Sequence, residues 1–197
     1  GRRTPLPLES CAMRLFVAVP LPPEAQAAAA EILGRLRAEE WPVRWVREDG
    51  LHITLKFFGD VMPERYDTIA EMIGFAVDDM GPMTLSITGA NAFPGLAHPR
   101  VIRLDLAGDA GALELLQDRL ERKGLGIGFP PEGRPFHPHI TLGRVKEGQR
   151  LPADAQQTLE ALPGGEPFLA DRVVLFESLA SPLGPRYDPR MEIALTT

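Results

Sequence analysis

"LHITLKFF", residues 51–58, and "HPHITLGR", residues 137–144, set two of the four histidines of this chain in front of the same Ile-Thr-Leu triplet. With residue frequencies of roughly 5 to 10% each, the chance that a further histidine carries this triplet is on the order of one in a thousand. The two copies lie in different halves of the 197 residues. This spacing indicates one duplicated unit of lobe size and not a short-period solenoid.

The tetrapeptide divides between two faces if it forms a strand. Successive strand side chains point to opposite faces, so each histidine shares a face with its threonine, and each isoleucine with its leucine. The aliphatic pair would anchor the strand in a core while the polar pair faces a groove. One isolated His-x-Thr is usually an ordinary half-exposed strand, but two identical copies favour a site. The predicted groove residues are His52, Thr54, His139 and Thr141.

Paired imidazoles suit proton transfer, because one can act as acid and the other as base near neutral pH. A threonine hydroxyl can donate a hydrogen bond to a phosphoryl oxygen or orient a water. His137 and His139 could instead form a metal pair, but no cysteine or acidic cluster accompanies them. We therefore expect no metal and no cofactor. We expect His98, in a proline-flanked loop, to be exposed to solvent.

Periodicity and turn signals predict a mixed order of strands and helices. The predicted strands are 13–19, 43–46, 51–58, 83–93, 100–106, the second HITL copy, 171–178 and 186–195. The predicted helices lie in 21–40, after Pro63, from Asp109 to Gly124 with capping chemistry at both ends, and weakly near 152–161. Because the order lacks a strict βαβ rhythm, it predicts the α+β class, with two antiparallel sheets related by a pseudo-twofold.

Composition excludes several classes of protein. With 44% hydrophobic and 24% charged residues, this is an ordinary globular chain. A net charge of -6 argues against a protein that coats long nucleic acid, although a short local basic pocket is compatible with it. A single cysteine, Cys11, allows no internal disulfide and supports no Cys/His zinc site.

The apolar stretches are too short for a membrane span, and the opening "GRRTPLPLESCA" has no apolar h-region. We therefore expect a cytoplasmic protein with no membrane contact. Residues 1–12 are interpreted as a flexible extension or an expression remnant, and residues 13–197 as a single domain that starts at its first strand.

From residue 13 to about 195 the chain resembles a known family. These are the bacterial and archaeal RNA 2′,3′-cyclic phosphodiesterases, also called 2′-5′ RNA ligases, of the two-histidine phosphoesterase superfamily. The resemblance rests on both HITL motifs with their flanks and on "MRLFVAVPLP", "GANAFPGLAHPRV" and "DRVVLFESLASPLGPRY". It implies a bilobal fold with outer helices and a central cleft.

The family also implies roles for particular residues. Both motif histidines are catalytic in this family and both motif threonines contact the phosphate, which would assign those roles to His52, His139, Thr54 and Thr141. The arginine after the second motif corresponds to Arg144, and the aromatic residue of "GPxY" to Tyr187. The resemblance places both in the substrate pocket. Strict alternation puts Arg144 on the same side as Leu142, but a strand end or a bulge can turn it toward the cleft. The other interpretation is an exposed arginine at the strand end, and both interpretations stay open.

Three positions depart from the family pattern. Arg103 stands where relatives often have an aromatic residue, which puts a base-stacking or wall contact there in doubt. Gly50 stands in "EDGLH" where Glu-Asn is more common before Leu-His, and Gly143 stands where alanine is common. We expect none of the three to touch the two histidines.

The resemblance implies a metal-independent enzyme that opens 2′,3′-cyclic phosphates at RNA or nucleotide ends and leaves 2′-phosphates, with His52 as the acid and His139 as the base. The same site run in reverse would join RNA ends through a 2′-5′ linkage. A different interpretation is a nucleotide-binding or sensing module that uses the groove without turnover. We expect a monomer without protein partners. The choice between tRNA halves and small cyclic nucleotides stays open.

Overall fold

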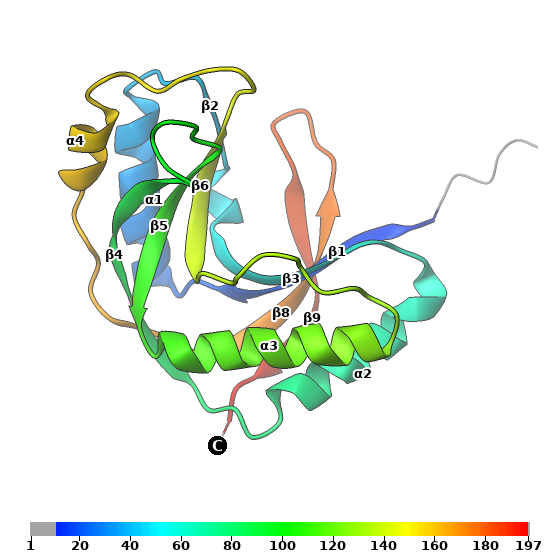
Figure 1. Ribbon diagram of the computed structural model, residues 1–197. Helices are drawn as coiled ribbons and strands as arrows, with labels where there is room; N and C mark the ends of the chain where they lie inside the picture. The colour runs from blue at the N-terminus through cyan, green and yellow to red at the C-terminus, as the bar shows by residue number, and fades with distance from the viewer. Residues whose placement is uncertain (1–10, 197) are drawn as a thin grey trace, which may run out of the picture.

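Two antiparallel sheets surrounded by helices make up the fold in the computed structural model, which describes residues 11–196 (Figure 1). The first sheet has the order β3-β1-β8-β9, with β1 (Met13–Pro20), β3 (His52–Val61), β8 (Arg172–Leu179) and β9 (Arg186–Ala194). The second has the order β2-β6-β5-β4-β7, with β2 (Val43–Trp45), β4 (Met83–Phe93), β5 (Val101–Gly108), β6 (His139–Val145) and β7 (Phe168–Ala170). The predicted α+β class with two antiparallel sheets is confirmed.

The sheets do not coincide with the two halves of the chain. Strand β2 lies between β1 and β3 in sequence but joins the second sheet, while β8 and β9 return from the end of the chain to the first. The HITL strands also differ in position, because β3 is an edge strand and β6 is an interior strand. The duplication is therefore clearest at the two motif strands themselves.

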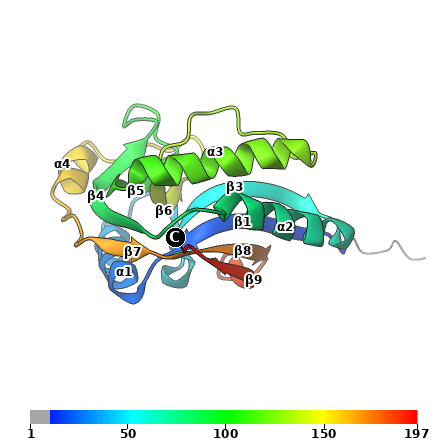
Figure 2. The ribbon, with the colours of Figure 1, turned by 90° about the horizontal axis from the view of Figure 1, so that it is seen from below.

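Four α-helices and two 3-10 turns lie within the described residues. They are α1 (Pro23–Arg37), α2 (Tyr66–Val77), α3 (Ala110–Gly126), α4 (Ala155–Glu160), η1 (Glu48–Gly50) and η2 (Pro63–Arg65). Helices α2 and α3 lie side by side on the outside of the sheets (Figure 2). None of the helices in residues 11–196 is long and apolar enough to cross a membrane.

The capping chemistry predicted for α3 is wrong. Asp109 precedes the helix, but its carboxylate accepts a hydrogen bond from the Thr84 backbone N–H at 2.8 Å and caps no helical N–H. The helix also continues past Gly124 to Gly126. The interpretation of residues 1–12 falls, up to residue 10, outside the described part of the chain, and β1 begins at Met13.

Both motif strands shift their pairing by one residue directly after the motif threonine. Against β1, Thr54 pairs with Ala18 and Lys56 with Val17, so the residue between them has no partner of its own. Against β5, Thr141 pairs with Arg103 and Gly143 with Ile102, so the leucine of the motif is again the residue without a partner. Such a bulge reverses the alternation of faces beyond it.

Candidate active site

The six residues predicted from the sequence line a single cleft of about 380 Å³ between the two sheets. His52 and Thr54 enter it from β3, His139, Thr141 and Arg144 from β6, and Tyr187 from β9. The two motif threonines follow their histidines by two residues, so alternation along each strand presents both pairs to the same space. The core-facing residues of the motifs are almost entirely buried: Ile53, Leu55, Ile140 and Leu142.

A backbone carbonyl fixes each imidazole. His52 Nδ1 lies 2.7 Å from the Gly50 carbonyl oxygen, and His139 Nδ1 lies 2.7 Å from the His137 carbonyl oxygen. A carbonyl oxygen only accepts, so Nδ1 carries the proton in both rings. Nε2 is therefore the atom that exchanges a proton with a substrate, and in His52 it accepts from the Thr54 hydroxyl at 2.7 Å.

The His52 ring packs among aromatic residues. Its centroid lies 5.1 Å from that of Phe16 and 5.2 Å from that of Tyr187, which meets it edge-on at 88°. The pKa of His52 is lowered to about 4, mainly by burial; the Gly50 carbonyl raises this pKa and the neighbouring His139 lowers it. His52 is therefore neutral in the free protein at neutral pH.

The second histidine has a more polar environment. Burial is the main cause that lowers the pKa of His139, and the charges of Arg103 and Arg144 act in the same direction. The His137 carbonyl and the Asp105 carboxylate oppose this by favouring the charged ring. The charges of two arginines and one carboxylate thus shift the pKa of His139 in opposite directions.

Tyr187 keeps its hydroxyl proton. Burial raises the pKa of this phenol, while Arg144 lowers it. A Cβ on Gly50 would lie 3.2 Å from Tyr187 Cε2, tighter than most real contacts. Gly50 therefore allows the close approach of Tyr187, and its carbonyl binds His52, so the prediction that it touches neither histidine is wrong.

The bulge in β6 decides the position of Arg144. Strict alternation would place this residue with buried Leu142, but the skipped position turns Gly143 to the core and Arg144 toward the cleft. A Cβ on Gly143 would lie 2.5 Å from Val43 Cγ1 and 2.8 Å from Trp45 Cε3. The absence of a side chain at 143 is thus required by the packing of β2.

Arg103, one of the three departures from the family pattern, also lines the cleft. Its guanidinium lies 4.4 Å from the centroid of the Phe93 ring. Its Nε donates to Asn91 Oδ1 at 3.3 Å and lies 3.3 Å from Asp105 Oδ1. A cation stacked on the Phe93 ring thus occupies the position at which relatives often have an aromatic residue.

Lys56 is a part of the site that the sequence pattern did not predict. Alternation would place it in the groove with Thr54, but the bulge turns it inward, where Nζ lies 2.9 Å from Glu121 Oε1 and 3.3 Å from the Pro130 carbonyl. The other carboxylate oxygen, Oε2, accepts from the Glu132 backbone N–H at 2.8 Å. This ion pair ties β3 and α3 to the loop that leads to His139.

Gly124 makes room for this lysine, because a Cβ there would lie 2.8 Å from Lys56 Cε. The sequence offered one usable signal for the pair: a lysine directly after an HITL motif whose second copy carries glycine at the same place. The loop itself supplies further lining residues: Glu132, Arg134, Pro135, Phe136 and His137.

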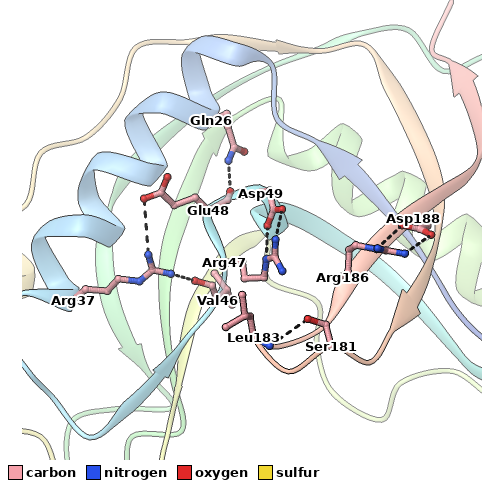
Figure 3. A network of polar contacts seen from close by, with 10 residues as sticks. All are labelled: Gln26, Arg37, Val46, Arg47, Glu48, Asp49, Ser181, Leu183, Arg186 and Asp188. Carbon is pink, nitrogen blue, oxygen red and sulfur yellow. Dashed lines mark hydrogen bonds and ion pairs between the residues drawn. The ribbon is translucent and has the colours of Figure 1, made fainter.

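Polar contacts also hold the segment before His52 (Figure 3). Gln26 on α1 donates to the Glu48 carbonyl, and Arg37 donates to the Val46 carbonyl. Arg47 forms a two-pronged pair with Asp49, with both N···O distances at 3.0 Å. These bonds fix the η1 turn whose last carbonyl orients the His52 ring.

The structure gives no support to a metal site at His137 and His139. Within residues 11–196, no three histidine, cysteine or acidic side chains come together in a group that could hold a metal ion. His98 is exposed, as expected.

Two sheets that present a His-x-Thr strand each to one cleft define the class of two-histidine phosphoesterase folds. Residues 21–181 match the 2′-5′ RNA ligase superfamily, and the chain belongs to this family. The predicted family is therefore confirmed.

Relatives and a solved structure extend this finding. A protein of Aeropyrum pernix named RNA 2′,3′-cyclic phosphodiesterase is 37% identical over 57% of this chain and 62% of its own length. One of the same name from Geobacillus stearothermophilus is 33% identical over 83% of this chain and 51% of its own length. The chain thus spans between half and two thirds of these two relatives. The crystal structure of E. coli LigT complexed with 3′-AMP shares 27% identity, covers 94% of this chain and 99% of its own, and has a TM-score of 0.73.

Proposed function

We propose that the protein hydrolyses 2′,3′-cyclic phosphates at the ends of RNA or nucleotides, without a metal ion, and releases 2′-phosphomonoesters. Water attacks phosphorus, the bond from phosphorus to O3′ breaks, and O3′ takes up a proton. The observation that carries this proposal is the pair of imidazoles, His52 and His139, in one cleft with both Nδ1 protons held by backbone carbonyls. Each Nε2 can then exchange a proton with the substrate, once the Thr54 hydroxyl, which donates to His52 Nε2 in the free protein, turns to a phosphoryl oxygen.

The reaction divides between the two histidines. His139 takes a proton from the attacking water and His52 protonates the leaving O3′, the assignment that the family resemblance implies. Because burial favours neutral imidazole at His52, its proton has to be stabilised by the anionic substrate itself. Thr54 and Thr141 donate hydrogen bonds to the phosphoryl oxygens as charge develops.

Two further residues complete the pocket. Arg144 supplies a guanidinium that attracts the phosphate, and Tyr187 supplies a protonated phenol beside His52. The names of the relatives support the cyclic phosphate as substrate, and the 3′-AMP bound by the E. coli neighbour supports a nucleotide ligand.

The deciding experiment incubates the EDTA-treated protein with a 2′,3′-cyclic nucleotide and identifies the phosphate isomer. We expect 2′-phosphate, and we expect kcat to fall by about 10²–10⁴ in His52→Ala and in His139→Ala. His98→Ala is the matched control, because this histidine is exposed and outside the cleft. Undiminished activity in either motif variant, or a 3′-phosphate product, would contradict the proposal.

The rival function is a nucleotide-binding module without turnover. It predicts that a nucleotide 2′-phosphate binds in a titration, while the turnover assay detects no product. The name of the family favours testing a second reaction as well, in which a 5′-hydroxyl replaces water and attacks the cyclic phosphate. The bond from phosphorus to O3′ again breaks, O3′ takes up a proton, and a 2′-5′ linkage forms. The cytoplasmic location and the monomeric state stay predictions.

A further inference from the structure

Five cations gather at one end of the second sheet, and we call them the basic rim: Arg44, Arg100, Arg144, Lys146 and Arg150. Arg44 and Arg144 face each other across the pairing of β2 with β6. The Val145 N–H donates to the Arg100 carbonyl at 2.9 Å, and the Lys146 N–H donates to the Pro42 carbonyl at 2.9 Å. Backbone bonds thus hold these segments together.

The charges of the rim cations are not neutralised by carboxylates of the described part of the chain. Within residues 11–196, none of the five forms an ion pair with a carboxylate. Cations near the first sheet behave differently: Arg47 pairs with Asp49 at 3.0 Å and Arg186 with Asp188 at 3.1 Å (Figure 3). Five such cations at one end of one sheet form a cationic strip on a chain whose net charge is -6.

Three of the rim cations line a second hollow, of about 570 Å³, that is separate from the catalytic cleft. Arg100, Lys146 and Arg150 line it together with His98. One carboxylate, that of Glu147, also lines the hollow, so cations outnumber acids there. Such a site favours an anion.

Arg144 connects the hollow to the reacting centre. It lines the catalytic cleft, and it lies two residues before Lys146 on the same strand end. From His139 to Lys146 an extended strand covers on the order of 20 Å. A cyclic mononucleotide, whose only phosphate lies between the histidines, cannot reach the far end of the rim.

We propose that the basic rim binds the phosphodiester backbone of a single-stranded RNA whose 2′,3′-cyclic end occupies the cleft. This inference rests on the proposed function and names its substrate class: a polynucleotide end in preference to a cyclic mononucleotide. Phosphates that precede the cyclic end leave the cleft past Arg144 and meet the unpaired cations beyond it. The overall negative charge does not prevent this, because charges more than about 10 Å apart are largely screened at physiological salt.

The test compares two substrates, a cyclic mononucleotide and a short single-stranded RNA that ends in the same cyclic nucleotide. The rim variant is Arg100→Gln with Lys146→Gln and Arg150→Gln, which leaves Arg144 in place. The control variant is Arg14→Gln with Arg35→Gln and Arg172→Gln. It removes the same charge from exposed arginines outside the cleft that do have carboxylate partners.

We expect the rim variant to raise KM for the RNA about tenfold and to leave mononucleotide turnover unchanged, which also shows that it folds. The salt dependence of RNA binding between about 50 and 200 mM should weaken by about 0.7 in log–log slope for each phosphate that the variant no longer neutralises. The control variant should behave as the parent protein does. An equal effect of the two variants, or an RNA KM unchanged by the rim variant, overturns the inference.

A binding measurement separates this inference from the proposed function. The anisotropy of a labelled RNA ending in a 2′-phosphate needs no turnover. If the parent protein cleaves neither substrate, the proposed function is wrong. RNA affinity alone then tests whether the basic rim binds RNA. An RNA affinity that falls in the rim variant and is kept in the control supports the rim, whereas equal affinity in both overturns it.

Discussion

Lys56 Nζ lies 2.9 Å from Glu121 Oε1 beside the cleft, and the two side chains are only 1% and 11% exposed. The partners are 65 residues apart in sequence. Through Glu121 Oε2 and the Pro130 carbonyl, the pair holds the loop that leads to the second histidine against the strand that carries the first. It therefore couples the two half-sites.

Breaking this pair should destabilise the protein strongly. Lys56→Met leaves a buried carboxylate without its cation, and Glu121→Leu leaves a buried ammonium, so each should cost about 3–5 kcal/mol of unfolding free energy. The double variant places two apolar side chains of similar size together and should recover most of that loss. Urea denaturation of the three variants measures the cycle.

The double variant still lacks the carboxylate that accepts a hydrogen bond from the Glu132 N–H. The loop that leads to His139 therefore loses this contact with α3. We therefore expect KM for a 2′,3′-cyclic nucleotide to stay raised after stability has recovered. A double variant as unstable as either single one would show that the pair is not the coupled unit described here.

Phe57 should act as a stacking surface for a nucleobase. The bulge turns this ring toward the cleft, where it is 54% exposed, and Arg144 holds the corresponding place in the second motif copy. Loss of a stacking ring costs about 1–3 kcal/mol, so Phe57→Ala should raise KM by about 5- to 150-fold with little change in kcat.

Phe75→Ala is the matched control for this variant, because Phe75 on α2 is 59% exposed and outside the cleft. Steady-state kinetics with a cyclic nucleotide measure both variants. A fall in kcat with KM unchanged would contradict the stacking role.

The HITL repeat was enough to predict that the two histidines and their threonines face a groove, because alternation over four residues is a local property. The order of strands and helices, without a strict βαβ rhythm, predicted the antiparallel sheets. The bulges were not predictable, since they depend on pairing with β1 and β5. They move Lys56 into the interior and Arg144 into the cleft, each opposite to strict alternation. The contact of Lys56 with Glu121 joins segments that no local pattern links.

Gly143→Ala should destabilise the protein by about 1–3 kcal/mol, because its Cβ would overlap Val43 Cγ1 and Trp45 Cε3. Adding Val43→Ala removes one of the two clashes, so the double variant should lose less than the sum of the single losses. Gly111→Ala is the control, since a Cβ there meets nothing within 4 Å. Thermal or urea unfolding of the parent, of both single variants, of the double variant and of Gly111→Ala checks this, and strict additivity would contradict the packing argument.

The pH dependence of kcat/KM should peak on the acid side of pH 6.5. Catalysis needs one protonated and one neutral imidazole, and the pKa of His52 is lowered to about 4 while that of His139 also lies below its usual value. The singly protonated pair dominates between the two successive protonation steps of the site. Activity should therefore fall at lower pH as the second proton binds, and at higher pH as the last one leaves.

Two variants should move the alkaline limb of this profile in opposite directions. Arg144 lowers the pKa of His139, so Arg144→Gln should move the limb to higher pH. Asp105 raises the same pKa, so Asp105→Asn should move it to lower pH. The shift is read from kcat/KM against pH and does not depend on how far either variant lowers the maximum rate. Limbs that move in the same direction, or a parent maximum above pH 7, would contradict the assignment of charge around His139.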